Sequence, residues 1–212
     1  ALFVAMLLVK PTKATGFYRA AYYLPSIIGG SVAVAILWKR MFAPDGVVNS
    51  ILGMMGIDTN FAWLSDTRTA IWTLILLAVW QFGSSMILFL AALKQVPQDL
   101  YEAATVDGAS RPRMFVKITI PMITPIVLFN IVMQMINAFQ EFSAPFLITN
   151  GGPLKATYLY SMMVYENAFS FLKMGYASAL SWIMFLIIMV FTAAIFWFSK
   201  YWVFYQDGGD NE

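Results

Sequence analysis

Residues 174–199 read MGYASALSWIMFLIIMVFTAAIFWFS and contain no charged side chain. The stretch lies between Lys173 and Lys200, and most of its 26 residues are apolar. An α-helix rises about 1.5 Å per residue, so about 20 apolar residues cross the hydrocarbon core of a bilayer. We therefore predict that 174–199 forms a membrane-spanning helix.

Three further intervals are long and uncharged. They hold 19 residues between Arg19 and Lys39, 25 between Arg68 and Lys94, and 23 between Lys117 and Glu141. In lipid the backbone amides must be satisfied within the segment, and a helix achieves this. The predicted complete spans are 20–40, 69–93, 118–140 and 174–199, and residues 1–9 are predicted to end a further helix whose beginning is missing.

The pattern of these intervals sets the fold class. None of them shows the ten-residue alternation that is typical of transmembrane strands. We predict an all-α fold, a polytopic transmembrane helical bundle, as a single domain over residues 1–212.

Composition supports this class and excludes several functions. The mean hydropathy is +0.72, and 11% of the residues are charged, against roughly 25% in soluble domains. The net charge of +2 is too small to indicate a nucleic-acid partner. Because the chain has no cysteine and no histidine, disulfides, thiolate or imidazole metal sites and histidine acid–base catalysis are excluded. We expect no metal, no cofactor and no enzymatic activity of its own.

Basic residues indicate the orientation in the membrane, since lysine and arginine are enriched in cytoplasmic loops. Segment 10–19 carries bases and no acid, segment 94–117 carries four bases, and segment 41–67 carries three acids and no base. The pattern places 10–19, 94–117 and the carboxyl-terminal tail in the cytoplasm, and 41–68 outside. Lys39 and Arg40 oppose it, but they lie at a helix end, where long side chains can reach the interface.

The cytoplasmic segment contains the most informative motif. Residues 96–125 read VPQDLYEAATVDGASRPRMFVKITIPMITP. Pro97 suits a first helical turn, Gly108 can supply the positive φ that ends a helix, and Ser110 suits the N-cap of the next one. The stretch therefore predicts two short helices with a break between them. Such a surface suits docking onto another protein, although its residues alone favour a plain link between two spans.

Its residues resemble a known motif. Glu102-Ala103-Ala104, Asp107-Gly108-Ala109, and then Phe115, Ile118, Pro121 and Pro125 are similar in type, order and spacing to the EAA loop of ABC-importer permeases. A second match, Thr149-Asn150-Gly151-Gly152-Pro153, resembles the carbohydrate-uptake branch of that family, of the maltose and glycerol-phosphate permease type. The resemblance covers essentially the whole chain and lacks only the family's amino-terminal helices.

This resemblance implies a fold, partners and a mechanism. It implies the ABC importer permease fold in the bacterial cytoplasmic (inner) membrane, paired with a second homologous permease subunit. A cytoplasmic ATPase dimer and an extracytoplasmic sugar-binding protein are the other implied partners. The implied ATPase-coupling residues are Glu102, Ala103, Ala104, Asp107, Gly108 and Ala109. The chain has no phosphate-binding loop, so ATP hydrolysis is expected on the separate ATPase.

Polar residues within the spans are candidates for binding sugar. Gln134, Asn137 and Glu141 follow one another at three and four positions, so they share a helix face. The resemblance implies that this helix lines the sugar site. Hydrogen bonding between helices is the alternative role for Gln134 and Asn137, and Glu141 could instead mark the outer boundary.

A second polar patch lies on span 69–93 and consists of Trp80, Gln81, Ser84 and Ser85. An indole face can stack on a sugar ring, while amides and hydroxyls can bond its hydroxyl groups. Core packing is an equally good interpretation of this patch. Gly29 and Gly30, in span 20–40, indicate close helix packing rather than substrate contact.

Two other classes of membrane protein compete with the importer. A secondary transporter should carry ionisable groups within its spans for ion coupling, and the four uncharged intervals contain none. A non-transport assembly subunit is opposed only by the EAA-like motif. The predicted function is that of a channel-forming permease subunit that moves a sugar or oligosaccharide by alternating access.

Overall fold

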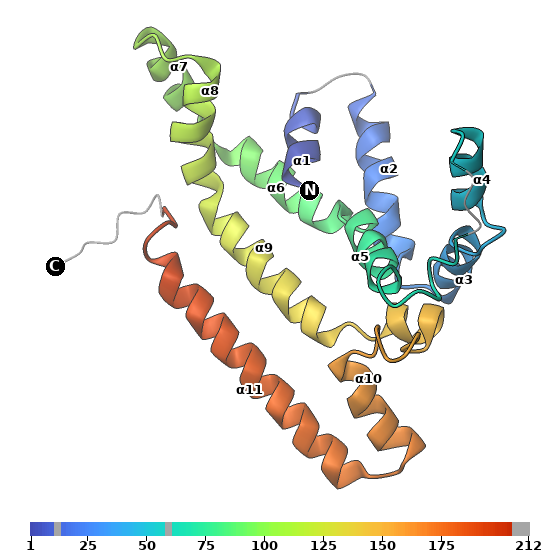
Figure 1. Cartoon of the computed structure of the whole chain (residues 1–212). Helices are drawn as coiled ribbons and strands as arrows, with labels where there is room; N and C mark the ends of the chain where they lie inside the picture. The colour runs from blue at the N-terminus through green and yellow to red at the C-terminus, as the bar shows by residue number, and fades with distance from the viewer. Residues whose placement is uncertain (11–13, 58–60, 205–212) are drawn as a thin grey trace. The chain divides into compact units, whose positions relative to one another are not determined.

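The computed structural model describes residues 1–10, 14–57 and 61–204, and those residues form helices and no strand (Figure 1). The all-α prediction is therefore confirmed. Lys13 and Asp58, which entered the charge pattern, lie outside the described residues.

The helices follow the predicted spans closely, with several breaks. The α-helices are α1 (Leu2–Leu8), α2 (Thr15–Ile28), α3 (Val32–Met41), α4 (Val47–Met54), α5 (Ala70–Trp80), α6 (Gly83–Gln95), α7 (Gln98–Val106), α8 (Arg111–Met114), α9 (Ile120–Gln140), α10 (Tyr160–Tyr165) and α11 (Met174–Ser199). Three π-helical segments continue them, η1 (Phe115–Thr119), η2 (Pro145–Thr149) and η3 (Glu166–Ser170).

Within the described part of the chain, two helical stretches are long and apolar enough to cross a membrane, Arg111–Thr149 with 39 residues and Met174–Ser199 with 26. Two bent pairs, α2 with α3 and α5 with α6, raise the number to four if each pair is one span. The bend between α2 and α3 is 100°, so segment 20–40 is not one continuous helix. Pro25 within α2 and the Gly29-Gly30 pair that follows it favour this break. The number of spans stays a prediction.

The chain divides into two compact units, each of which is described by itself. Unit 1 comprises 1–23, 83–136 and 188–212, and unit 2 comprises 24–82 and 137–187. In unit 1, α1 packs on α6, and Ala92, Val96 and Ile123 form a buried cluster. The prediction of a single domain over 1–212 is therefore still only a prediction.

The core of unit 2 joins α3, α5 and η2. Val34, Ala35, Trp38, Phe42, Leu74, Leu77 and Ile148 form its buried cluster. The indole Nε1 of Trp38 donates to the carbonyl oxygen of Thr73 at 3.0 Å, and its ring lies 6.0 Å from that of Trp80. Because a buried indole N–H needs a partner, this bond fixes α3 against α5.

The loop after α3 is held by one asparagine. Asn49 on α4 donates to the carbonyl oxygens of Pro44 and Phe61, each at 2.9 Å, and accepts from Trp63 Nε1 at 2.8 Å. Arg40, whose charge opposes the predicted orientation, forms an exposed ion pair with Asp45 at 2.9 Å. Exposed pairs of this kind contribute little stability, so Asn49 is the main link between the two sides of this loop.

Candidate coupling and substrate sites

The predicted coupling motif folds as a short helical hairpin, α7 followed by α8, next to the start of α9 (Figure 1). Gly108 has φ +73°, and its N–H donates to Thr105 O at 3.0 Å, while Ala109 N–H donates to Ala104 O at 2.9 Å. These two bonds are the Schellman arrangement that ends a helix at a left-handed residue. The predicted break and the positive φ of Gly108 are thereby confirmed.

The start of α8 matches the sequence prediction only in part. Ser110 is at the N-cap with an extended backbone, and Pro112 lies in the first turn, as the sequence predicts. The Ser110 side chain makes no capping hydrogen bond. The hairpin is therefore defined mainly by the glycine turn and not by a side-chain cap.

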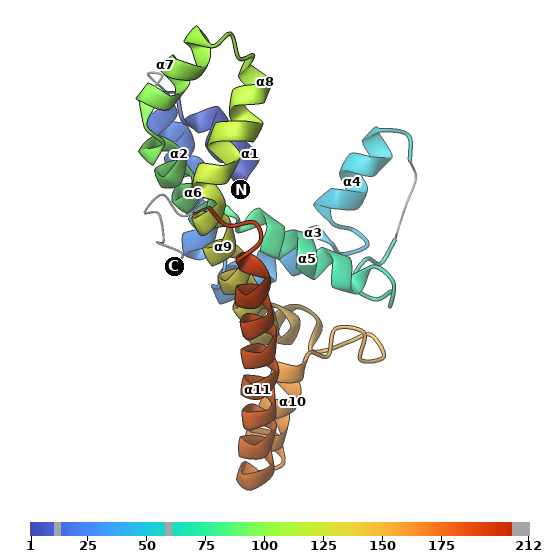
Figure 2. The ribbon, with the colours of Figure 1, turned by 90° about the vertical axis from the view of Figure 1, so that its left-hand side faces the viewer.

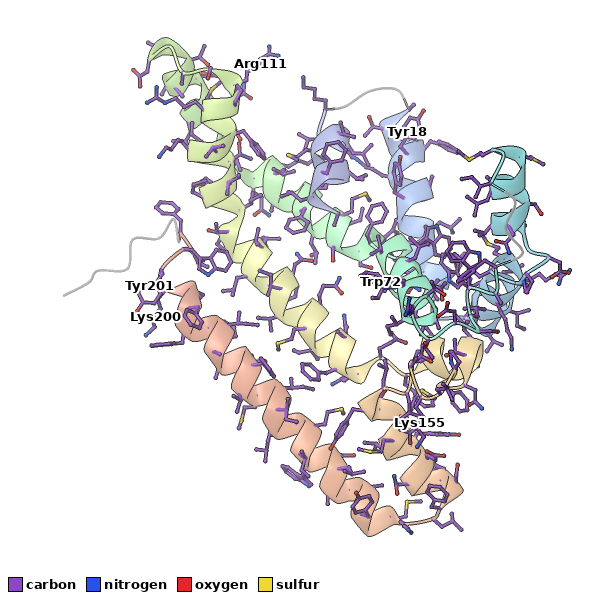
Figure 3. All side chains as sticks on the ribbon, viewed as in Figure 1. Tyr18, Trp72, Arg111, Lys155, Lys200 and Tyr201 are labelled. Atoms are coloured by element: carbon purple, nitrogen blue, oxygen red, sulfur yellow. The ribbon has the colours of Figure 1, made fainter. Side chains whose placement is uncertain are left out.

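The hairpin presents its surface outward, because α7 has no buried residue. Leu100 is 40% exposed and Val106 is 88% exposed, which leaves apolar groups in contact with solvent. The coupling residues Glu102, Ala103, Asp107 and Gly108 are exposed, and Ala104 and Ala109 are half-buried. Arg111, labelled in Figure 3, is exposed at the start of α8. An exposed surface that mixes apolar and charged groups is suited to a protein partner.

One hydrogen bond connects this surface to the helix behind it. Tyr101 on α7 and Thr119 at the end of η1 share a hydrogen bond of 2.7 Å between their hydroxyl groups. The side chain of Tyr101 also packs against the buried cluster of unit 1, which includes Ile123 of α9. These contacts connect α7 to the first turns of α9.

Of the predicted substrate residues, Gln134 and Ser84 lie in unit 1. Gln134 Nε2 donates to the hydroxyl of Ser85, the neighbour of Ser84, at 2.9 Å. This bond joins α9 to α6, which is the packing role that the sequence left open for Gln134. The Gln134 side chain is nevertheless exposed, so part of its amide remains accessible.

The other four candidates, Trp80, Gln81, Asn137 and Glu141, lie in unit 2. Asn137 is exposed near the end of α9. Glu141 lies just beyond that helix, and its Oε1 accepts the N–H of Ala144 at 3.0 Å. Its backbone carbonyl oxygen accepts a hydrogen bond from Ser161. Glu141 thus stabilises the junction between α9 and η2, and its predicted roles at the sugar site or at the outer boundary stay predictions.

Gln81 lies in the two-residue gap between α5 and α6, packed against the bend between α2 and α3. The hydroxyl of Ser26 donates to the carbonyl oxygen of Gln81 at 2.9 Å. A Cβ atom added at Gly29 would lie 2.2 Å from Cδ of Gln81, whereas one added at Gly30 would meet no atom within 4 Å. Close packing is therefore confirmed at Gly29, and its prediction at Gly30 is wrong, because the space around that glycine is open. Ser26 was missed, because a serine after a proline gives no signal of a contact 55 residues away.

The geometry and the apolar helices define the class of an integral membrane permease, and comparison with known proteins agrees. Residues 12–203 match the family described as "Binding-protein-dependent transport system inner membrane component". The chain belongs to this family and is a multi-pass protein of the cytoplasmic membrane, as the EAA-like motif indicated.

Individual relatives carry the same description. The chain is 51% identical over 208 residues to the probable ABC transporter permease protein YesP of Bacillus subtilis (strain 168), covering 97% of the chain and 67% of the relative. It is 34% identical to the lactose transport system permease protein LacF of Rhizobium radiobacter, covering 94% and 69%. The chain spans 48% to 67% of the length of several such relatives.

A solved structure shares the fold. A chain in the crystal structure of a bacterial alginate ABC transporter, in complex with an alginate pentasaccharide-bound periplasmic protein, superposes with a TM-score of 0.82. The sequence identity is 24%, and the match covers 94% of this chain and 70% of that one. The ABC importer permease fold is therefore confirmed.

Proposed function

We propose that this chain is a pathway-forming permease subunit of an ATP-driven, binding-protein-dependent sugar importer. The observation that carries the proposal is the exposed α7–α8 hairpin with its left-handed Gly108, at the place where the family carries its ATPase-coupling loop. Relatives named for lactose, starch degradation products and sn-glycerol-3-phosphate support a carbohydrate-type substrate.

The partners follow from the family. A second homologous permease subunit completes the pathway, a cytoplasmic ATPase dimer binds the hairpins of both permeases, and an extracytoplasmic binding protein delivers the sugar. ATP is hydrolysed on the separate ATPase. The family's description as binding-protein-dependent supports the extracytoplasmic binding protein most directly.

The described contacts support a specific route for the motion. Closure of the ATPases pushes on α7, whose exposed Leu100 and Val106 offer the contact surface. Tyr101 passes the push through Thr119 and the buried cluster around Ile123 to the start of α9. Because packed cores move as rigid bodies, the push reorients whole helices and alternates access to the pathway.

We propose that polar groups within the spans line the route of the sugar. The candidates are Gln134, Asn137, Glu141, Trp80, Gln81 and Ser84, as the sequence predicts. Among them Asn137 is exposed, and Gln81 lies at a helix break, where transporters commonly place polar groups that bind substrate. A secondary transporter or an assembly subunit remains the alternative, and neither would explain the coupling hairpin.

The decisive test replaces Gly108 in the complete importer. Gly108→Val places a β-branched side chain at φ +73°, which strongly disfavours it, whereas Gly108→Asn places a residue that tolerates this conformation. Both variants should insert and assemble. Sugar-stimulated ATPase activity should fall toward the basal rate in Gly108→Val and remain near wild type in Gly108→Asn.

The readout is ATPase activity of the reconstituted importer with sugar-loaded binding protein, alongside co-purification of all subunits. Full stimulation of an intact Gly108→Val complex would show that the hairpin is only a connector between helices. That result would remove the main support for the proposed function.

A further inference from the structure

The loop between η2 and α10 has an unusual backbone. Among the described residues outside glycine, only four have positive φ, and three of them lie in this loop, Asn150 at 50°, Leu154 at 46° and Lys155 at 63°. Leucine and lysine rarely adopt this conformation, because Cβ approaches the following carbonyl oxygen. Two such residues in succession persist only where the surrounding structure holds them.

Several contacts hold the base of the loop. Thr157 is completely buried, and its hydroxyl donates to the carbonyl oxygen of Gly152 at 2.7 Å. Thr149 and Thr157 share a hydrogen bond of 2.6 Å between their hydroxyl groups. Gly151 is packed so closely that an added Cβ would lie 3.0 Å from the ring of Tyr158. The base therefore has little freedom to rearrange.

Tyr158 anchors the far side of the loop. Its hydroxyl donates to the carboxylate of Glu166 in η3. Partial burial, together with the hydrogen bond and charge of Glu166, raises the pKa of Tyr158 to about 12. The phenol therefore remains a donor at every physiological pH. The ring of Tyr158 also lies 5.1 Å from the ammonium group of Lys155, which restrains that side chain.

On this rigid base the loop presents an apolar tip. Leu154 is 93% exposed, the highest value among the large apolar side chains of the described residues. Lys155 beside it is the sole charged residue between Glu141 and Glu166. Figure 2 shows the loop extending away from α10, and Lys155 is labelled in Figure 3. A strained backbone that exposes a leucine next to a single cation indicates a contact point for a partner.

We propose that Leu154 and Lys155 form a docking tip for the extracytoplasmic binding protein, with Leu154 entering an apolar hollow and Lys155 facing an acidic rim. The inference rests on the proposed function. The family is described as binding-protein-dependent. The predicted span 118–140 separates this loop from segment 94–117, which the charge pattern places in the cytoplasm, so the loop is expected outside.

The bilayer surface is the other occupant that a leucine–lysine tip could meet. A flexible segment can insert into lipid as well as a rigid one, because lipid adapts to any apolar shape. A tip held in a disfavoured conformation is an advantage only against a partner of fixed shape, where pre-organisation increases affinity. The observed rigidity therefore favours the protein.

The chain supplies a matched control for the test. Leu172 is also an exposed leucine with positive φ, 75% exposed and at φ 55°, and it lies in the turn before α11. Truncation of either leucine to alanine changes side-chain size equally and leaves the backbone requirement the same. A difference between Leu154→Ala and Leu172→Ala therefore reports the surroundings of Leu154.

The assay is ATPase stimulation of the reconstituted importer as purified, sugar-loaded binding protein is titrated. Wild-type stimulation is required first, and its absence would overturn the proposed function itself. Given stimulation, Leu154→Ala should raise the half-saturating concentration about tenfold, as loss of a central interface anchor does. Leu172→Ala should leave it within about twofold, with basal ATPase activity unchanged.

Lys155→Glu provides a second measurement. It should raise the half-saturating concentration and weaken its dependence on salt, because a rim charge acts mainly on association. Equal responses of Leu154→Ala and Leu172→Ala would overturn the docking proposal while leaving the importer function intact. The same conclusion would follow if Leu154→Ala changed the titration in liposomes but not in detergent, since the tip would then contact lipid.

Discussion

The contact between Gly29 and Gln81 gives a prediction whose size follows from the structure. In Gly29→Ala the new Cβ would lie 2.2 Å from Cδ, 2.5 Å from Cγ and 2.6 Å from Oε1 of Gln81. Carbon atoms in contact are about 3.5–4.0 Å apart, so the Gln81 side chain must move by more than 1 Å. Overpacking costs about 1–3 kcal/mol, and the cost lies at the low end here because the atoms struck belong to a flexible, half-buried side chain.

Gly30→Ala is the matched control, since a Cβ there meets nothing within 4 Å. Both variants lose the same backbone freedom in the unfolded chain, so this contribution cancels between them. In detergent, Gly29→Ala should therefore unfold at a lower temperature than Gly30→Ala. Its transport should fall as well if the displaced Gln81 amide contacts sugar, by about 5- to 150-fold in apparent affinity for a lost hydrogen bond.

A double variant tests the reasoning directly. Gln81→Ala removes all three atoms that Gly29→Ala would strike, so the second substitution should be nearly neutral in that background. The two changes should be non-additive by about 1–3 kcal/mol. Equal melting of Gly29→Ala and Gly30→Ala, or strict additivity of Gly29→Ala with Gln81→Ala, would refute the close contact.

Two further predictions concern orientation and substrate. Because the chain has no cysteine, Ser50→Cys and Ser110→Cys each introduce one thiol, and a membrane-impermeant reagent should label only the first in intact cells. Reversed labelling would invert the predicted topology. Asn137→Ala should reduce the apparent transport affinity by about 5- to 150-fold while subunit assembly, checked by co-purification, survives. Normal transport by this variant would place the sugar site elsewhere.

Local features were predictable from the sequence. The turn at Gly108 depends only on residues within a few positions of it, two helix signatures separated by a glycine, and the structure has the expected φ of +73°. The apolar stretches that became α9 and α11 are likewise local, because charge spacing alone defines them. The EAA-like motif identified the family for the same reason.

Features that depend on distant contacts were not predictable. Gly83 and the serines after it allow a break in segment 69–93, but the sequence does not show that Ser26 on another helix supports the break at Gln81. The left-handed Leu154 was missed because leucine itself disfavours that conformation, and the hydroxyl of Thr157 supports it from within the fold. The partner of Gln134 was not predictable either, since sequence spacing gives a shared helix face but does not show that the Gln134 amide bonds Ser85.

The bond between Ser26 and Gln81 also has a consequence for biogenesis. A break in an apolar segment exposes a backbone carbonyl group, which is unfavourable in lipid without a donor. Ser26 precedes Gln81 by 55 residues, so the ribosome releases the donor before the acceptor. Segment 69–93 can therefore leave the translocon as one apolar stretch and bend against a helix that is already in place. Because of this order of synthesis, the Gln81 carbonyl group has its hydrogen-bond donor available when the newly inserted segment bends in the lipid.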